Sequence, residues 1–266
     1  MNRDIRIIAS DFDGTLRRNG EVSANDRNAV EKWRSLGRLF GLVTGRDVSD
    51  ALTAVEQSGG MEFDFIICCS GAYIIGRDGS CIFETTADCE RLSELCGYIL
   101  DKSPMWLSRC YGKEKIGVPV GFNSGKAVGI VDKSEKRLFL TADDFSREDL
   151  YNRFHILHTA VKPAELASEC ADEINRRFEG YVTAFQNGES LDIVRYGVSK
   201  SYGIRQLVKY LVMSEENVIT VGDNFNDVEM IRDFCGCAVS SGKDAAKNAA
   251  TAVYDGIAEM ISAIIG

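Results

Sequence analysis

Hydrophobic residues recur in short, largely apolar runs that alternate with amphipathic stretches in the first part of the chain. The run 5–9 is too short for a helix, and a turn signal follows it at once. Similar runs occupy 39–43 and 63–69, and the stretches 24–36 and 48–57 place their apolar residues on one helical face. Strands that are apolar throughout and alternate with helices are typical of a parallel sheet covered on both faces. The sequence therefore predicts an α/β fold.

The pattern changes in the middle of the chain, where hairpins and separate helices replace the alternation. Hairpins are predicted at 73–83 around Asp78-Gly79, at 127–140 around 132–135, and at 181–194. Helices are predicted at 88–100 and 163–178, and strands at 105–110 and 154–159. We interpret this region as an α+β domain inserted into the first domain.

The alternation of strands and helices returns at Lys200. The predicted helices are 200–211, 227–233 and a last one from 256, and the predicted strands are 217–221 and 237–239. The expected organisation is a parallel-sheet core formed by residues 1–84 and 192–266, with residues 85–191 as the inserted α+β domain.

Composition restricts the classes of partner. The chain has 266 residues and a net charge of −9, which argues against a nucleic-acid or anionic-membrane surface. No apolar run approaches the roughly 20 residues of a membrane span, and the N-terminus lacks the features of a signal peptide. With an odd number of cysteines, nine, we expect reduced thiols and a cytoplasmic location. Cys68-Cys69 and Cys235-Gly236-Cys237 lie in apolar runs, which favours buried thiols over a zinc site.

The end of the first strand carries two aspartates, Asp11 and Asp13, whose spacing puts both carboxylates on one side. Gly14 then allows the backbone to turn sharply. Carboxylates this close repel one another unless a cation or a proton intervenes, and Mg²⁺ with its preference for oxygen ligands is the natural cation. The alternative is a surface turn rich in Asp and Gly.

Other predicted strand ends and one helix start also carry chemical groups: Thr44-Gly45, Lys200, and Gly222-Asp223 with Asn226 and Asp227. In an open parallel sheet these ends meet at one edge, where ligands bind. Together the groups supply a nucleophile, a second carboxylate, a hydroxyl, backbone donors, a cation and a metal ligand. This set suits phosphoryl transfer, which depends on positioning and charge neutralisation.

With these motifs in this order, the chain resembles the haloacid dehalogenase-like (HAD) phosphohydrolases. The stretch Asp11-Phe12-Asp13-Gly14-Thr15-Leu16 is similar to the first motif of that superfamily, and Thr44 in Leu42-Val43-Thr44-Gly45-Arg46 is similar to the second. Lys200 matches the third motif, and Gly222 to Asp227 the fourth. The resemblance implies a Rossmann-like core. The inserted domain lies between the second and third motifs, where the Cof-like group carries its large α/β cap.

Two stretches depart from the Cof-like pattern. Ser70-Gly71-Ala72 stands where that group usually has Asn-Gly-Ala, and 241–245 replaces a Met-Gly-Asn-Ala stretch. Both departures concern the rim of the implied site.

The resemblance implies a role for each site residue. Asp11 would attack phosphorus, and Asp13 would protonate the leaving oxygen and then activate water. Asp13 could instead be a structural carboxylate that bridges to the metal. The implied phosphate-binding set is Asp11, Thr44, Gly45, Lys200 and Asn226. The implied metal set is Asp11, Asp13 through its backbone carbonyl, and Asp223, with Asp227 as support that orients Lys200. Thr44 would hold a phosphoryl oxygen with its hydroxyl and backbone N–H, or could be a helix N-cap, or both. Lys200 would balance the phosphoryl charge, or could be an ordinary surface lysine.

These inferences lead to one expected activity. We expect a Mg²⁺-dependent phosphomonoesterase that hydrolyses small phosphorylated metabolites, sugar phosphates first, through an aspartyl-phosphate, with the cap closing over the leaving group. The alternatives are a phosphomutase of the same superfamily and, less favoured, a non-catalytic phosphate-binding regulator. We expect a monomer or a small homo-oligomer that binds neither nucleic acid nor membranes.

Overall fold

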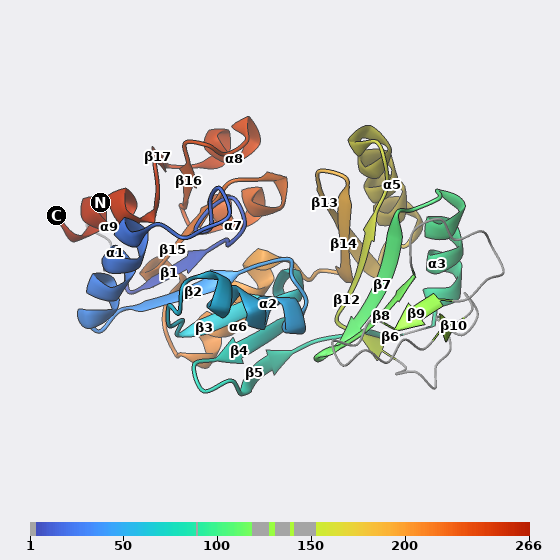
Figure 1. Cartoon of the computed structure of the whole chain (residues 1–266), viewed down its shortest axis with the longest axis horizontal. Coiled ribbons are helices and arrows are strands. Elements are labelled where there is room, and N and C mark those ends of the chain that lie inside the picture. The colour runs from blue at the N-terminus through green and yellow to red at the C-terminus, as the bar shows by residue number, and fades with distance from the viewer. Residues whose placement is uncertain (1–3, 89, 119–127, 131–138, 141–152) are drawn as a thin grey trace. The chain divides into compact units, whose positions relative to one another are not determined.

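The computed structural model describes residues 4–88, 90–118, 128–130, 139–140 and 153–266. Contacts between residues divide the chain into two compact units (Figure 1). The first unit comprises residues 1–83 and 199–266, and the second unit comprises residues 84–198.

The first unit is built on a sheet with the strand order β17-β16-β15-β1-β2-β3-β4-β5. From β17 to β3 the neighbouring strands are parallel, whereas β4 is antiparallel to β3. The strands are β1 (Ile7–Ser10), β2 (Leu39–Val43), β3 (Phe65–Cys68), β4 (Tyr73–Gly76), β5 (Cys81–Glu84), β15 (Val218–Gly222), β16 (Cys237–Val239) and β17 (Ala252–Tyr254).

Helices accompany this sheet as the alternation of the sequence predicts. They are α1 (Ala24–Ser35), α2 (Val48–Gln57), α6 (Lys200–Tyr210), α7 (Val228–Asp233), α8 (Asp244–Ala249) and α9 (Ile257–Ile265), with short 3₁₀ turns η1 (Cys69–Gly71), η2 (Glu215–Asn217) and η3 (Phe225–Asp227). Apolar residues of α6 and α7 pack in one cluster with the side chains Ile7 and Ala9 of β1. On another side, α1 packs against α9 and β2.

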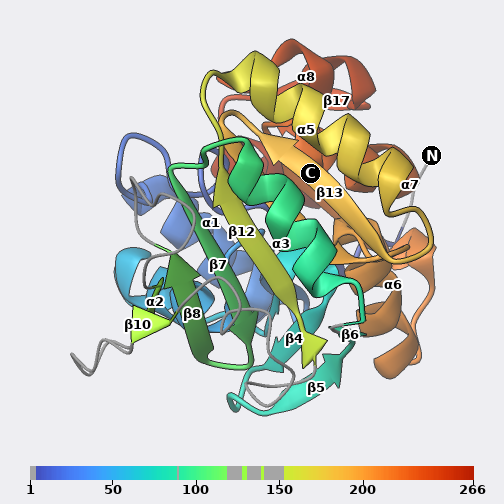
Figure 2. The same cartoon turned by 90° about the vertical axis from the view of Figure 1, so that its right-hand side faces the viewer.

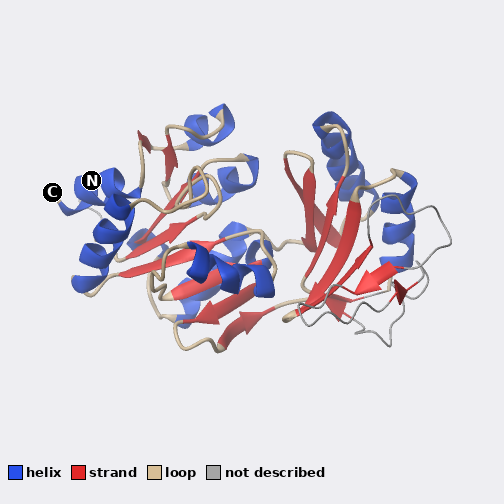
Figure 3. Cartoon of the chain, viewed as in Figure 1, coloured by secondary structure: helices blue, strands red, loops and turns tan. Residues whose placement is uncertain are grey.

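The second unit is an antiparallel sheet with helices on one face (Figure 3). Its strand order is β10-β9-β8-β7-β12-β14-β13, and β6 and β11 form a separate pair. The strands are β6 (Ala87–Asp88), β7 (Trp106–Tyr111), β8 (Glu114–Val118), β9 (Val128–Ile130), β10 (Phe139–Leu140), β11 (Arg153–Phe154), β12 (Ile156–Ala160), β13 (Val182–Asn187) and β14 (Ser190–Arg195). The helices α3 (Leu92–Asp101) and α5 (Ala164–Arg177) share one apolar cluster with the sheet.

The predicted fold class, a parallel-sheet α/β core with an α+β insertion, is confirmed. The pattern missed β6, β8, β17 and α8. The predicted turn at 132–135 lies outside the described residues, although β9 and β10 do pair as a hairpin. The predicted boundary between residues 191 and 192 falls inside β14. Among the described residues, no helix is both long and apolar enough to cross a membrane.

Candidate active site

The carboxyl ends of three neighbouring strands in the first unit bring the predicted site residues together. Ser10 at the end of β1 is in register with Val221 of β15 on one side and with Leu42 of β2 on the other. Asp11, Asp223 and Thr44 follow these strand ends within a few residues. Parallel pairing therefore places at one edge groups that lie far apart in the sequence.

Lys200 joins two of the carboxylates. It is the first residue of α6, after the N-cap Ser199, and its side chain is buried. Its Nζ donates to Asp11 Oδ1 at 2.7 Å and to Asp227 Oδ1 at 2.6 Å. Burial by itself would lower the pKa of Lys200, but the charges of the two carboxylates outweigh it and raise that pKa. Lys200 is therefore a buried cation, and the alternative of a solvated surface lysine is excluded.

Three carboxylates form an acidic cluster around this lysine. One oxygen each of Asp11, Asp223 and Asp227 lies within 4.8 Å of the others. Burial raises the pKa of Asp11 well above its usual value, and the charges of Asp227 and Asp223 raise it further, against the opposing effect of Lys200. Burial also raises the pKa of Asp223. Because one ammonium cannot balance three carboxylates, the cluster fits a divalent cation with oxygen ligands.

Further contacts hold Asp223 and Asp227 in place. The Thr15 hydroxyl donates to Asp223 Oδ1 at 2.7 Å, and the Asp223 N–H donates to Asp227 Oδ2 at 3.0 Å. Gly14 has φ +95°, and a Cβ there would lie 2.5 Å from Asp223 Oδ2. A side chain at this position would therefore be strained and would displace the Asp223 carboxylate.

The Asp13 carboxylate is turned toward arginines. Arg46 donates from Nε to Asp13 Oδ2 at 2.7 Å and from Nη2 to Oδ1 at 2.8 Å. Arg17 adds a longer contact of 3.3 Å. The Asp13 side chain is 46% exposed, so solvent or a ligand can reach it. Of the predicted metal set, Asp11 and Asp223 lie together with Asp227, whereas the Asp13 side chain is held by Arg46.

Arg46 is a site residue to which the sequence analysis assigned no role. Its guanidinium lies 4.9 Å from the centre of the Phe12 ring, and Nη1 donates to Gln57 Oε1 at 2.9 Å. Its position directly after Thr44-Gly45 was the available signal.

The Thr44 backbone is engaged in a way that corrects one expectation. Its N–H donates to the Ile67 carbonyl at 2.8 Å, so this N–H is not available to a phosphoryl oxygen. The Thr44 hydroxyl accepts from the Arg46 N–H at 3.2 Å and can still donate its own proton. The N-cap of α2 is Asp47, so Thr44 is not the helix cap. Gly45 follows Thr44 directly, and Asn226 lies half-buried in η3.

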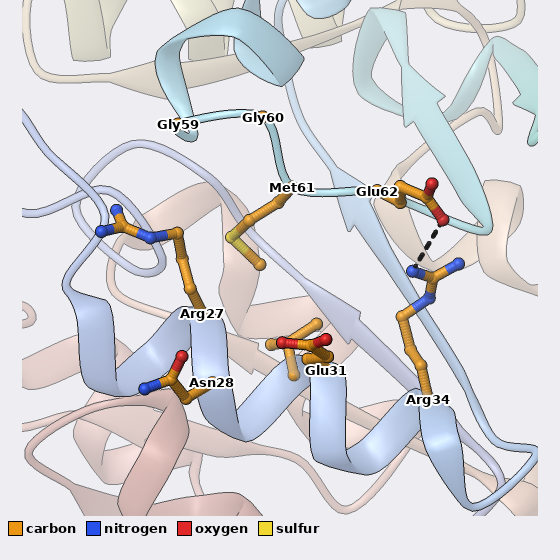
Figure 4. A pocket seen from close by; sticks show the side chains of 9 residues that line it. Arg27, Asn28, Glu31, Arg34, Gly59, Gly60, Met61 and Glu62 are labelled. Carbon is orange, nitrogen blue, oxygen red and sulfur yellow. Dashed lines mark hydrogen bonds and ion pairs between the residues drawn. The ribbon is translucent and has the colours of Figure 1, made fainter.

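A cavity of about 450 Å³ elsewhere in the first unit lies between α1 and the segment 59–62 (Figure 4). Charged side chains line it, but Arg34 is already bound by Glu62 at 3.2 Å and by Asp64 at 2.9 Å. The acidic cluster at the strand ends, where buried charge is unbalanced, is therefore the stronger candidate for chemistry.

Comparisons with known proteins agree with this assignment. Residues 8–261 match the model of the haloacid dehalogenase-like hydrolases. The stress response protein YhaX of Bacillus subtilis is 24% identical over 245 residues, which cover 89% of this chain and 83% of YhaX. The 5-amino-6-(5-phospho-D-ribitylamino)uracil phosphatase YcsE of the same organism is 22% identical over 266 residues, which cover 97% of this chain and 95% of YcsE. The solved structure of a HAD subclass IIB sugar phosphatase matches with a TM-score of 0.77 at 16% sequence identity. The match covers 97% of this chain and 98% of the sugar phosphatase.

Proposed function

The chain belongs to the haloacid dehalogenase-like hydrolases and is a phosphatase, and we propose that it hydrolyses small phosphorylated metabolites through an aspartyl-phosphate on Asp11. The observation that carries this proposal is the buried Lys200, whose Nζ lies 2.7 Å from Asp11 Oδ1 and 2.6 Å from Asp227 Oδ1. A buried carboxylate beside a fixed cation is suited to meet an anionic phosphoryl group, because the cation offsets the repulsion between the two.

In the first step an Asp11 oxygen attacks phosphorus, and the bond from phosphorus to the leaving oxygen breaks. The negative charge on the phosphoryl oxygens is balanced by Lys200, and the Thr44 hydroxyl donates to one of them. Asp227 accepts a hydrogen bond from Lys200 and so keeps its ammonium directed at Asp11. Gly45 and Asn226 complete the proposed phosphate-binding set.

Asp13 is the proposed acid and base. In its protonated form it gives a proton to the leaving alkoxide; in the second step it takes a proton from the water that attacks the aspartyl-phosphate, which releases phosphate and restores Asp11. Its exposed side chain suits this exchange with solvent. Asp13 must give up at least one bond to Arg46 in order to reach the leaving oxygen, since Arg46 binds both of its oxygens.

The acidic cluster fits Mg²⁺. Asp11 and Asp223 would hold it with Asp13 at the proposed site, and Asp227, whose oxygens are bound to Lys200 and to the Asp223 N–H, would support them. When bound, the ion would neutralise charge on the phosphoryl oxygens.

Sugar phosphates are the proposed substrates. YcsE and the structural neighbour are named as phosphatases of a phosphoribityl compound and of sugar phosphates, and both names describe a phosphate on a sugar or sugar alcohol. We further propose a cytoplasmic monomer or small homo-oligomer without nucleic-acid or membrane partners, in keeping with the net charge of −9.

Phosphate release from p-nitrophenyl phosphate tests the proposal. Activity should disappear in excess chelator and return with Mg²⁺, because the carboxylates would otherwise repel one another and the substrate. Asp11→Asn should abolish turnover. Asp13→Asn should lower turnover of an alkyl phosphate by about 10²–10⁴-fold, and the first step with p-nitrophenyl phosphate, whose leaving group needs no proton, should suffer less. Near-normal turnover of the Asp11→Asn variant would show that the nucleophile is wrongly assigned.

A further inference from the structure

The cavity between α1 and the segment 59–62 has charged walls and lies within the first unit. Arg27, Glu31 and Arg34 follow one another at helical spacing along α1, so they share the face of the helix that is turned toward this segment (Figure 4). None of the described residues of the second unit, whose helices α3 and α5 face the viewer in Figure 2, lines the cavity. Its volume of about 450 Å³ is sufficient for a small metabolite.

Two of the charged side chains in this cavity have no charged partner. Arg34 is already bound by two carboxylates. Arg27 is half-buried, and its side chain donates only to the Val22 carbonyl, at 2.5 Å from Nη1. Within the part of the chain that the structure describes, the Glu31 side chain forms neither an ion pair nor a hydrogen bond. The cavity therefore presents one cation and one anion, a single helical turn apart, that are both available to a ligand.

The wall opposite α1 adds an apolar surface and a backbone donor. Met61 is directed toward α1 (Figure 4), and its side chain and that of Val30 are buried. Gly59 has φ +75°, and a Cβ there would lie 3.2 Å from Arg27 Nη1, so the absence of a side chain lets this wall approach the guanidinium. The N–H of Gly60 has no acceptor among the described residues.

We propose that this cavity binds a free α-amino acid with an uncharged side chain. Arg27 binds the carboxylate of the ligand, Glu31 binds its ammonium, and Met61 contacts its side chain. Two residues four apart on a helix have Cβ atoms about 5–6 Å from each other, so their charges match the adjacent charges of an α-amino acid. Because Arg34 is already neutralised by Glu62, a charged ligand side chain would find no partner and would be disfavoured.

Hydrogen bonds connect this site to the candidate acid and base, and the resulting regulation rests on the proposed function. Segment 59–62 directly follows α2, and the Met61 N–H donates to Ser58 Oγ at 3.1 Å. Gln57, the last residue of α2, accepts from Arg46 Nη1 at 2.9 Å, and Arg46 binds both oxygens of Asp13. A ligand that fixes segment 59–62 holds this arrangement in place. Because Asp13 must give up a bond to Arg46 during catalysis, the bound amino acid lowers turnover.

Calorimetric titration of the full chain tests the binding site, in excess chelator and without a phosphate ester so that no turnover occurs. L-Leucine should bind saturably. Isocaproate lacks its ammonium and isoamylamine lacks its carboxylate, so each should bind about 10-fold more weakly or worse. Glu31→Gln should weaken L-leucine binding by about 10-fold and leave isocaproate binding unchanged. This variant should keep the wild-type Tm, since Glu31 has no partner to lose. Arg27→Gln should weaken the binding of both L-leucine and isocaproate.

Lys32→Gln is the matched control, because it removes a charge from the exposed surface of α1 next to Glu31 but outside the cavity. Its affinity for L-leucine should stay within about 2-fold of the wild type. The inference is overturned if L-leucine shows no saturable binding up to about 10 mM. Equal affinity of the wild type and Glu31→Gln for L-leucine would also overturn it.

Phosphate release from p-nitrophenyl phosphate with Mg²⁺ tests the regulation. Saturating L-leucine should lower kcat by about 5-fold or more. Gln57→Ala removes the hydrogen bond to Arg46, so it should keep the affinity for L-leucine and lose the inhibition. L-Leucine that binds without changing kcat would overturn the regulatory role. If the wild type releases no phosphate, the proposed function fails, whereas the titration still decides whether the amino acid binds.

Discussion

At the scale of single residues, the candidate site pairs most of its charges. Lys200 is shared by Asp11 and Asp227, and Arg46 binds both oxygens of Asp13. The two aspartates of the first strand end thus have different partners although they are two residues apart. Asp11 is fixed beside the buried ammonium of Lys200. Asp13 lies at the surface, where its bonds to the Arg46 guanidinium can be exchanged for bonds to solvent or a ligand.

Arg46→Gln tests whether this guanidinium positions Asp13. Loss of the two charge-assisted hydrogen bonds should let the carboxylate rotate and lower kcat by about 10- to 100-fold, with the larger loss for alcohols that need protonation. Arg17→Gln is the control, because Arg17 makes a single 3.3 Å contact with Asp13, and its effect should be about 2-fold. Steady-state kinetics with a good and a poor leaving group make the comparison. Equal losses for both leaving groups would speak against a positioning role.

The sequence predicted the acidic cluster but not the contact between Arg46 and Asp13, and the difference has a physical reason. Parallel strands end at a common edge, so adjacency of the groups that follow them can be predicted from strand pattern alone. The partner of a long side chain depends on the exact course of two loops. Asp13 and Arg46 are 33 positions apart, and nothing in the local pattern of either indicates the other.

At the scale of elements, a buried aspartate connects the β1–α1 loop to the C-terminal helix. Asp26 in the first turn of α1 accepts from Arg18 Nη2 at 2.7 Å and from the Ala258 N–H of α9 at 2.8 Å. Arg18 Nη1 in turn donates to the carbonyl of Thr15, whose hydroxyl holds Asp223. The loop that supports the acidic cluster is thus attached to two helices.

Asp26→Ala should lower the free energy of unfolding by about 3–5 kcal/mol, because it leaves a partly buried guanidinium without its carboxylate. Asp244→Ala is the control: Asp244 also lies in the first turn of a helix, but its side chain is 91% exposed and pairs with Lys247 at 3.0 Å. Its removal should change stability by less than about 0.5 kcal/mol. Urea unfolding of both variants gives the measurement, and similar losses would contradict the structural role of Asp26.

Helices and strands were predicted more accurately where their residues are buried. Strands β1 and β15 at the centre of the first sheet are buried throughout, and the predicted run 39–43 coincides with β2. The missed strand β17 has three residues, none of them buried, and the missed helix α8 is six residues long with one buried residue, Ala246. Short elements of this kind leave too weak a periodicity to be recognised.

At the scale of the whole molecule, the second unit is inserted into the sequence of the first unit. The chain leaves the first unit after Phe83 and re-enters it at Ser199. The Phe83 and Tyr202 rings lie 6.0 Å apart, so the two crossing points are close together. The predicted domain boundary between residues 191 and 192 falls within β14. This strand pairs with β12 and β13 along its length, so it cannot be divided between the two units.

Deletion of residues 84–198 tests where selectivity resides. Because Phe83 and Tyr202 are in contact, a short Gly-Ser linker can join Phe83 to Ser199. The residues proposed for catalysis all belong to the first unit and act on the phosphoryl group and the metal, so they cannot distinguish one alcohol from another. If the shortened chain folds, as circular dichroism would show, it should hydrolyse p-nitrophenyl phosphate slowly. Its kcat/KM values for different sugar phosphates should lie within about tenfold of one another, because the groups that read the alcohol are gone. A shortened chain that keeps the substrate ranking of the full chain would place selectivity in the first unit, and Ser70, Lys243 and Asp244 would then be the residues to substitute.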